Sequence, residues 1–371
     1  MLSHSLGYVG IDNQGLSGLE LQYDKYLTGK SGAIKYFSDA KGNKLNLSDI
    51  YVEAQDGMNI SLTIDINIQK SLERELDNVV DMFSPDMALA IVMDPNNGEI
   101  LGMASRPDYD PNNYQDYTQE VLSRNLPIWA SYEPGSTFKI ITTSAAVEEG
   151  VVDLNKDHFY DSGSVNVDGS TLRCWKAGGH GEQTFLQVLQ NSCNPGFVKM
   201  GQLLGKETLF SYIDKFGFGR KTGVDLNGEG KGIIFNLNQV GNVELATTAF
   251  GQGVSVTPIQ QVAAVSAVVN GGTLYEPYIV KSISEKETGS IIEQTKKKKI
   301  RQVISKKTSR IMRHALESVV AKGGGKSAYI EGYRIGGKTG TAQKVQDGKY
   351  LVGNYICLLY TSPSPRDTER S

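Results

Sequence analysis

Cysteine and histidine are scarce in this chain of 371 residues, which has three cysteines and four histidines. Three cysteines are too few for a disulfide scaffold, and none of them belongs to a Cys-x-x-Cys pair. The histidines, at positions 4, 158, 180 and 314, form no His-x-x-x-His pair of the kind that binds zinc on a helix. From this spacing alone, we expect no metal site and no cofactor.

Long apolar runs and a large excess of one charge are also missing. No run reaches the roughly 18 apolar residues of a membrane-spanning helix, and Met1-Leu2-Ser3-His4 does not open a signal peptide. The net charge of −3 gives no reason to expect nucleic acid as a partner. The one strongly basic run, residues 296–299, is typical of a solvated loop or helix end.

What the chain does have is a serine and a lysine at the start of an apolar helix. Pro134 and Gly135 break the chain before an Ala- and Ile-rich run, which predicts a buried helix closed by Gly150. Ser136 is expected at the helix N-terminus, where unpaired N–H groups favour developing negative charge. Lys139 falls on the same helical face, so its amine can approach the Ser136 hydroxyl. The pattern fits an activated nucleophile, although a helix cap followed by a solvated lysine gives the same pattern.

Two further motifs favour the nucleophile. Ser192-Cys193-Asn194 follows a predicted helix that Thr184 caps, and Pro195 places the motif on a turn. Lys338-Thr339-Gly340-Thr341 lies in a glycine-rich predicted strand, residues 333–344. The three motifs occur in the order of the Ser-x-x-Lys, Ser-x-Asn and Lys-Thr-Gly signature of penicillin-binding proteins and class A β-lactamases.

Two segments resemble these motifs but have other interpretations. Residues 332–339 also satisfy the phosphate-loop pattern Gly-x4-Gly-Lys-Thr. That loop needs an apolar strand before it and a helix after it, whereas a glycine-rich joint at 323–325 precedes this segment and turn-forming residues 346–348 follow it. Nucleotide binding is therefore the minor alternative. A second Lys-Thr-Gly, at 221–223, is interpreted as a structural turn.

Apolar periodicity predicts mixed α and β structure around the motifs. Residues 60–64 alternate as a strand, residues 68–82 have helical spacing, and residues 87–93 and 99–103 are expected to pair as a hairpin. Further helices are expected at 185–189, 197–204, 209–216, 258–269 and 305–321.

Longer segments resemble class B penicillin-binding proteins over residues 7–356. The resemblance rests on residues 62–65, 132–136, 217–219 with 222–225, and 250–253 with Thr257-Pro258. Residues 173–176 and 178–181, together with the Ser-Cys-Asn triplet, are most similar to the sporulation-specific, stage V type D branch or a related division transpeptidase. The resemblance implies an α+β transpeptidase fold shared with serine β-lactamases: an antiparallel sheet flanked by helices, plus a helical subdomain.

The activity implied by the resemblance is that of a serine D,D-transpeptidase. Such an enzyme cross-links peptidoglycan stem peptides ending in D-Ala-D-Ala, and β-lactams acylate the same serine. The resemblance also implies a membrane-anchored protein on the outer face of the cell membrane, with a membrane glycosyltransferase as partner. Division, elongation and spore cortex synthesis stay open as roles. A β-lactamase, a β-lactam sensor and a catalytically silent scaffold stay open as alternatives, although no glutamate for hydrolysing the acyl-enzyme can be identified.

The catalytic roles expected in this scheme fall on four residues. Lys139, made neutral by burial and by the nearby ammonium of Lys338, takes the proton of the nucleophile Ser136. Ser192 relays a proton to the leaving amine, and Asn194 holds Lys139 and the substrate amide.

The substrate is expected to bind along the Lys-Thr-Gly strand. Lys338, Thr339 and Thr341, with Gly340 between them, would hold a substrate carboxylate. Backbone N–H groups of Ser136 and Thr341 would form the oxyanion hole.

The two cysteines at 174 and 193 allow two interpretations. Cys193 lies inside the Ser-x-Asn motif, and a small packed thiol is the simpler explanation. The alternative is a reversible disulfide between Cys174 and Cys193 that distorts the Ser192 turn and switches the enzyme off outside the cell, where disulfides persist.

We expect three segments along the chain. Residues 1–55 resemble the C-terminal part of a β-rich, dimerisation-type N-terminal pedestal. Residues 56–356 are expected to form the transpeptidase domain without the family's final strands and C-terminal helix, so the chain is expected to be a fragment that also lacks the anchor. Residues 357–371, rich in Ser, Pro and Arg, resemble neither a strand nor a helix and are expected to be a non-native tail.

Overall fold

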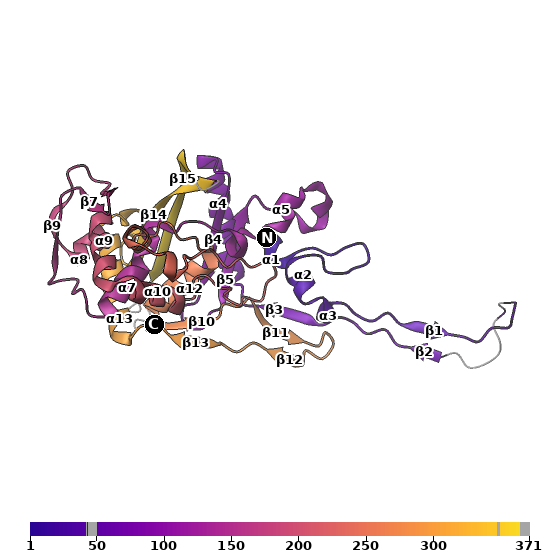
Figure 1. Ribbon diagram of the computed structural model, residues 1–371. Helices are drawn as coiled ribbons and strands as arrows, with labels where there is room; N and C mark the ends of the chain where they lie inside the picture. The colour runs from indigo at the N-terminus through magenta and orange to yellow at the C-terminus, as the bar shows by residue number, and fades with distance from the viewer. Residues whose placement is uncertain (42, 44–49, 347–348, 364–371) are drawn as a thin grey trace.

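A body of helices and short sheets carries an extended hairpin arm at one end (Figure 1). In this computed structural model, residues 1–41, 43, 50–346 and 349–363 are described. The order of elements alternates helices with small antiparallel sheets, and the helix that follows Ser136 lies inside the body. The architecture is the α+β class that the sequence predicts.

The N-terminal part combines short helices with the arm. Helices α1 (Ser3–Leu6), α2 (Gly18–Gln22) and α3 (Asp24–Leu27) precede strands β1 (Ala33–Lys35) and β2 (Ile50–Val52). The two strands pair antiparallel, and every side chain in them is exposed. Strand structure in the described part of residues 1–55 is therefore confined to the arm, and the segment before it is helical.

The next segment builds a helix over a hairpin, as predicted. Strand β3 (Asn59–Leu62) joins β11 (Val280–Ser284) and β12 (Ile291–Gln294) in the order β12-β11-β3. Helix α4 (Ile66–Phe83), capped by the Asp65 carboxylate, covers the hairpin of β4 (Ala88–Met93) and β5 (Ile100–Arg106). Buried Gln69 fixes this packing because its side-chain amide pairs with both the N–H and the C=O of Met103, each at 2.9 Å.

Short elements lead into and out of the central helix. Before it come η1 (Pro111–Asp116), α5 (Gln119–Ser123), α6 (Leu126–Trp129) and η2 (Gly135–Thr137). After it come two small antiparallel sheets, which pair β6 (His158–Asp161) with β9 (Gly181–Thr184) and β7 (Ser164–Val167) with β8 (Ser170–Arg173).

The central helix is α7 (Lys139–Glu148), whose residues 139–146 are all buried. Its polar side chains are satisfied within the body: the hydroxyls of Thr143 and Ser144 donate to the helix carbonyls of Lys139 and Ile140, each at 2.7 Å. Buried hydroxyls with partners do not carry the full cost of desolvation. This helix therefore anchors the largest apolar cluster of the protein while it presents Lys139 at its first turn.

The remaining predicted helices are confirmed, with shifted ends. A capping box between Thr184 and Gln187 starts α8, and another between Thr257 and Gln260 starts α12. The predicted helices are α8 (Phe185–Gln190), α9 (Asn194–Leu204), α10 (Lys206–Lys215), α12 (Pro258–Val269) and α13 (Lys306–Lys322). Helix α11 (Asn242–Ala249) was not predicted. The other elements in this part are η3 (Leu237–Gln239), η4 (Lys326–Ala328) and the paired strands β10 (Thr273–Tyr275) and β13 (Lys299–Gln302).

The end of the described chain corrects one prediction. Strand β14 (Ile335–Gln346) pairs antiparallel with β15 (Lys349–Pro363), so residues 357–363 form strand rather than an irregular segment. The prediction relied on Ser and Pro content, but the open edge of β14 supplies backbone partners for any extended segment that follows the turn. Tyr360 adds a side-chain contact, since its hydroxyl lies 2.6 Å from that of Tyr132.

Within the described residues, every helix is too short or too polar to cross a membrane.

Candidate active site

Ser136 lies on a tight turn that leads directly into α7. It belongs to η2, and it is partly exposed while its neighbours Gly135 and Thr137 are buried. Gly135 has a φ of 50°, which a glycine adopts without steric cost. The turn is also held from outside, because the N–H of Gly135 donates to the carbonyl of Gly251 at 2.9 Å. The serine is therefore presented on a fixed backbone.

Lys139 points from α7 into the Ser-x-Asn turn. Its Nζ is 2.8 Å from the carbonyl oxygen of Ser192, 3.0 Å from Ser192 Oγ and 2.6 Å from Asn194 Oδ1. Ser192 has a φ of 53°, so the turn holds a non-glycine residue in the left-handed region. Such backbone strain is found where the surroundings hold a functional side chain in place.

A hydroxyl joins the lysine to the nucleophile. Ser192 Oγ lies 3.0 Å from Ser136 Oγ and 3.0 Å from Lys139 Nζ. The sequence predicted that the lysine amine approaches Ser136 directly, whereas the structure places the Ser192 hydroxyl between them. The four predicted catalytic residues are thus brought together, in the order Ser136, Ser192, Lys139, Asn194.

The environment of Lys139 favours the neutral amine. Its side chain is fully buried, and burial together with the nearby ammonium of Lys338 holds the pKa of Lys139 well below its usual range. Lys338 is also buried, and burial lowers its pKa to about 8. Burial therefore favours the proton-accepting form of Lys139, while Lys338 keeps its charge near neutral pH.

The Lys-Thr-Gly segment runs along β14 beside the Ser136 turn. In a strand, alternate side chains point to opposite faces; accordingly Lys338 and Gly340 are buried, Thr339 is partly exposed and Thr341 is exposed. The Nζ of Lys338 donates to the carbonyl of Thr339 at 2.9 Å. Thr339 and Thr341 therefore lie on the accessible face of the strand, while Lys338 lies on its buried face.

Glycine at position 340 permits the strand to lie against the turn. A Cβ added at Gly340 would be 2.8 Å from Thr137 Cγ2, closer than such contacts allow, and one added at Gly135 would be 3.0 Å from the carbonyl oxygen of Thr341. The backbone of Thr341 is thus next to the Ser136 turn. The continuous strand through Lys338 also rules out the phosphate-loop alternative, because no helix follows the lysine among the described residues.

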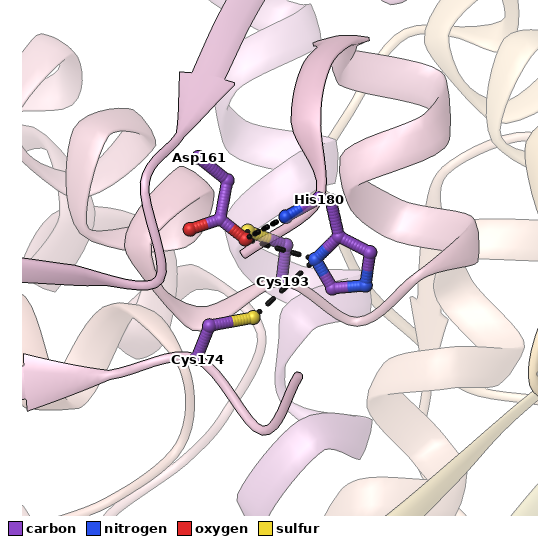
Figure 2. Close-up of side chains that lie close together, drawn as sticks. All are labelled: Asp161, Cys174, His180 and Cys193. Atoms are coloured by element: carbon purple, nitrogen blue, oxygen red, sulfur yellow. Dashed lines mark hydrogen bonds and ion pairs between the residues drawn. The ribbon is translucent and has the colours of Figure 1, made fainter. Parts of the chain in front are cut away.

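The two cysteines lie close together, and a histidine and an aspartate lie beside them (Figure 2). Cys174 and Cys193 are both buried free thiols, and their Sγ atoms, His180 Nδ1 and a carboxylate oxygen of Asp161 lie within 4.8 Å of one another. Burial raises the pKa of the Cys193 thiol to about 12. Burial opposes ionisation of Asp161, yet hydrogen bonds, first that from His180, outweigh it and hold the pKa of the carboxyl below its usual range. Sequence spacing missed this cluster because its members are on separate elements.

Family models match almost the whole chain. The model described as penicillin binding protein transpeptidase domain matches residues 88–367, and that described as penicillin-binding protein dimerisation domain matches residues 2–62. The chain belongs to the penicillin-binding protein transpeptidase family. The predicted class B resemblance is therefore confirmed, and the predicted site residues lie within the matched transpeptidase domain.

Relatives of this penicillin-binding protein include a sporulation protein and a peptidoglycan D,D-transpeptidase. The chain is 60% identical over 356 residues to stage V sporulation protein D of Bacillus subtilis, covering 96% of this chain and 55% of that protein. It is 33% identical to the peptidoglycan D,D-transpeptidase FtsI of Escherichia coli K12, covering 95% of this chain and 57% of that protein. The chain thus spans little more than half the length of these relatives.

Solved structures of penicillin-binding proteins share the fold. The structure of penicillin binding protein 3 from Mycobacterium tuberculosis superimposes with a TM-score of 0.87 at 28% identity, covering 98% of this chain and 79% of that one. The same protein has been solved in complex with ampicillin, where the TM-score is 0.86 at 28% identity over 97% of this chain and 78% of that one.

Proposed function

We propose that this chain carries the catalytic site of a serine D,D-transpeptidase that cross-links peptidoglycan stem peptides. The observation that carries the proposal is the contact series from Lys139 through the Ser192 hydroxyl to Ser136, with the Lys-Thr-Gly strand alongside. A buried neutral amine, an activated serine and an edge for an extended peptide are the parts that acyl transfer to a peptide needs.

The proposed reaction uses the contacts as a proton relay. Hydroxyl hydrogens rotate freely, so the proton of Ser136 can pass to Ser192 while the Ser192 proton passes to neutral Lys139. Ser136 Oγ then attacks the carbonyl of the penultimate D-Ala, and the terminal D-Ala leaves with a proton returned through Ser192. The amine of a second stem peptide attacks the acyl-enzyme and restores the Ser136 hydroxyl.

The proposed binding of substrate assigns the remaining residues. The charge of Lys338 and the hydroxyls of Thr339 and Thr341 attract the terminal carboxylate, and Gly340 lets this strand lie near the serine. Asn194 orients Lys139 through their 2.6 Å contact. The backbone N–H groups of Ser136 and Thr341 supply the oxyanion hole for the tetrahedral intermediate.

A β-lactamase is less well supported than a transpeptidase. Rapid hydrolysis of the acyl-enzyme needs a base that activates water. In the part of the chain that the structure describes, the hydrogen bonds of Ser136, Lys139 and Ser192 reach no carboxylate. We therefore expect β-lactams to form long-lived adducts on Ser136, which a sensor would share but a β-lactamase would not.

The decisive experiment measures the intact mass of the protein after incubation with a fluorescent penicillin. The wild-type chain should gain one penicillin that persists for many minutes, and Ser136→Ala should gain none. Ser144→Ala is a matched control, because Ser144 lies on the same helix and its hydroxyl, among the described residues, donates to the carbonyl of Ile140 alone. An adduct that survives in Ser136→Ala contradicts the assignment, and rapid loss of the adduct from the wild type indicates a β-lactamase.

Turnover separates a transpeptidase from a sensor. With a synthetic stem peptide and an amine acceptor, a transpeptidase releases D-Ala and forms the cross-linked product, whereas a sensor or silent scaffold forms none. We also infer that the site faces the outside of the cell membrane in the whole protein. A penicillin that does not cross the membrane should label it in intact cells, and failure to label would count against that location.

The proposed partner follows from the substrate. Stem peptides are carried by glycan strands, so a glycosyltransferase must supply the polymer, and a membrane glycosyltransferase is the partner that we infer. Cross-linking from a lipid-linked precursor should occur only when that glycosyltransferase is present. Cross-linking in its absence would contradict the inferred partner.

A further inference from the structure

Four side chains with metal-binding atoms meet behind the Ser-x-Asn turn. His180 Nδ1 is 2.8 Å from Asp161 Oδ2 and 3.3 Å from Cys174 Sγ, and Cys193 Sγ is 3.2 Å from the same oxygen of Asp161. Figure 2 shows all four side chains pointing toward one another. Asp161 and Cys193 are buried almost completely, Cys174 is 8% exposed, and the His180 side chain is 7% exposed.

We propose that Asp161, Cys174, His180 and Cys193 bind one zinc ion. Two thiolates, an imidazole and a carboxylate are a donor set that zinc prefers, and calcium or magnesium would select oxygen donors instead. Four protein ligands complete a tetrahedron, which is typical of a structural rather than a catalytic zinc site. The proposal concerns metal binding and does not depend on the transpeptidase reaction.

The distances between donor atoms are close to those that zinc requires. Usual zinc–ligand distances in a tetrahedron place nitrogen and oxygen donors about 3.3 Å apart, sulfur and nitrogen about 3.6 Å apart, and two sulfurs about 3.8 Å apart. In this structure the corresponding contacts are 2.8 Å between nitrogen and oxygen and 3.3 Å between sulfur and nitrogen. Zinc binding needs these two pairs to move apart by a few tenths of an ångström, and all four donor atoms already lie within 4.8 Å of one another.

The local fold explains why these residues meet although they are far apart in sequence. Asp161 ends β6, and Cys174 follows β8 with its N–H bonded to the carbonyl of Gly163 at 2.8 Å. Gly179, at a φ of 78°, lets the loop before β9 pass over Asp161, since a Cβ there would be 2.2 Å from the Asp161 carbonyl. This loop brings His180 above the carboxylate.

The contacts around the cluster also hold its donors in place. The backbone N–H of His180 donates to Asp161 Oδ2 at 3.0 Å, and that of Gly163 donates to Asp161 Oδ1 at 2.8 Å. The Trp175 ring meets the His180 ring edge-on at 5.4 Å, and Trp175 Nε1 donates to the Asn191 carbonyl at 2.7 Å. Such contacts to the ligands fix their orientation and raise metal affinity.

A metal here would hold the catalytic turn. Cys193 is the middle residue between Ser192, which contacts Ser136 at 3.0 Å, and Asn194, which contacts Lys139 at 2.6 Å. Zinc bound to Cys193 would tie this turn to β6 and to the His180 loop. Cys193 is thus a positioning residue for the turn.

Metal content tests the site directly. The chain would be purified with a reductant, loaded with Zn²⁺, freed of excess metal on a desalting column and analysed for zinc and protein. We expect about one zinc per chain in the wild type and a loss of most of it in Cys193→Ser and His180→Ala. His158→Ala and Cys357→Ser are matched controls, because both residues are exposed, and they should keep the metal.

Cobalt provides a second measurement that reports on the ligands. Co²⁺ in place of zinc should show the absorption of a thiolate–cobalt bond, and this absorption should weaken in Cys174→Ser, whose fold is checked by circular dichroism. A wild-type chain that keeps no zinc, or Cys193→Ser and His180→Ala variants that keep as much as the wild type, overturns the proposal.

The same experiment separates a metal site from a disulfide. Thiol counting before loading detects a disulfide between Cys174 and Cys193, and reduction must then restore zinc binding. A reduced chain that binds no zinc shows that these thiols form a redox pair only and rejects the metal site. Removal of zinc by a chelator should slow acylation by penicillin several-fold in the wild type, and an unchanged rate would reject the positioning role.

Discussion

At the scale of single residues, two buried lysines divide the work of the site. Lys139 touches the oxygen atoms of Ser192 and Asn194, whereas Lys338 lies under the strand that carries Thr339 and Thr341. Burial lowers the pKa of both lysines, and the ammonium of Lys338 lowers that of Lys139 further. One amine can therefore lose its proton while the other keeps it.

This arrangement predicts how acylation depends on pH. The pKa of Lys338 is lowered to about 8, so its positive charge is lost as pH rises through about 8, and attraction for the substrate carboxylate is lost with it. The rate of acylation by penicillin should therefore fall above that pH. At acidic pH, the rate should rise with pH as Lys139 loses its proton, because the neutral amine is the active form. The pKa of Lys139 is also lowered, so this rise should come at a lower pH than for an ordinary lysine.

Two controls attribute the alkaline limb to Lys338. Lys338→Arg keeps its positive charge at all pH values used. The fall in its acylation rate at alkaline pH should therefore move to higher pH, even if its overall rate is lower. A penicillin ester that lacks the carboxylate should show no such limb in the wild type. A limb that stays at the same pH in Lys338→Arg assigns the titration to another group.

At the scale of elements, the site depends on how closely β14 lies against the Ser136 turn. Gly340→Ala places a Cβ 2.8 Å from Thr137 Cγ2, so the strand and the turn must separate. We expect a loss of about 1–3 kcal/mol in the free energy of unfolding and a larger fractional loss in acylation rate, measured by chemical denaturation and by penicillin labelling.

Gly324→Ala is the matched control for that change. A Cβ at Gly324 meets its nearest atom, Thr339 Oγ1, only at 3.8 Å, which is an ordinary contact. Stability and labelling should stay near wild-type values in this variant. Wild-type labelling in Gly340→Ala would show that the spacing between strand and turn does not limit the reaction.

At the scale of the whole molecule, the β1–β2 arm is separate from the catalytic body (Figure 1). All side chains of both strands are exposed, and at the base of the arm Lys30 and Gln55 exchange backbone hydrogen bonds of 2.8 and 2.9 Å. An Asn-Gly turn can close two paired strands. Replacing residues 31–54 by Asn-Gly should therefore leave the melting temperature and penicillin labelling unchanged.

A contrasting variant checks that the assay detects coupling between the N-terminal segment and the body. Asp225 accepts hydrogen bonds from the N–H groups of Ile279 and Val280 at 2.8 Å and from Tyr23 OH at 3.3 Å. Asp225→Ala leaves buried donors unpaired and should cost about 1–3 kcal/mol in unfolding free energy. If the arm replacement destabilises the protein as much as Asp225→Ala does, the arm packs on the body in solution.

The sequence by itself determined the local parts of this protein. Thr184 caps its helix as predicted, and the helices predicted from 258 and 305 begin where Thr257 and Ser305 cap them, because a cap bonds to backbone only two or three residues away. The order of the Ser-x-x-Lys, Ser-x-Asn and Lys-Thr-Gly motifs was likewise enough to name the candidate site, and longer matching segments indicated the family.

Only the tertiary structure decided what depends on contacts between distant segments. It placed Ser192 Oγ between Lys139 and Ser136, paired residues 357–363 with β14, and joined Asp161, His180 and two cysteines in one cluster. No spacing rule predicts such a cluster, because its members come from different strands and loops. The shifted pKa values of Lys139 and Lys338 have the same origin, since burial and the distance between two charges exist only in the folded chain.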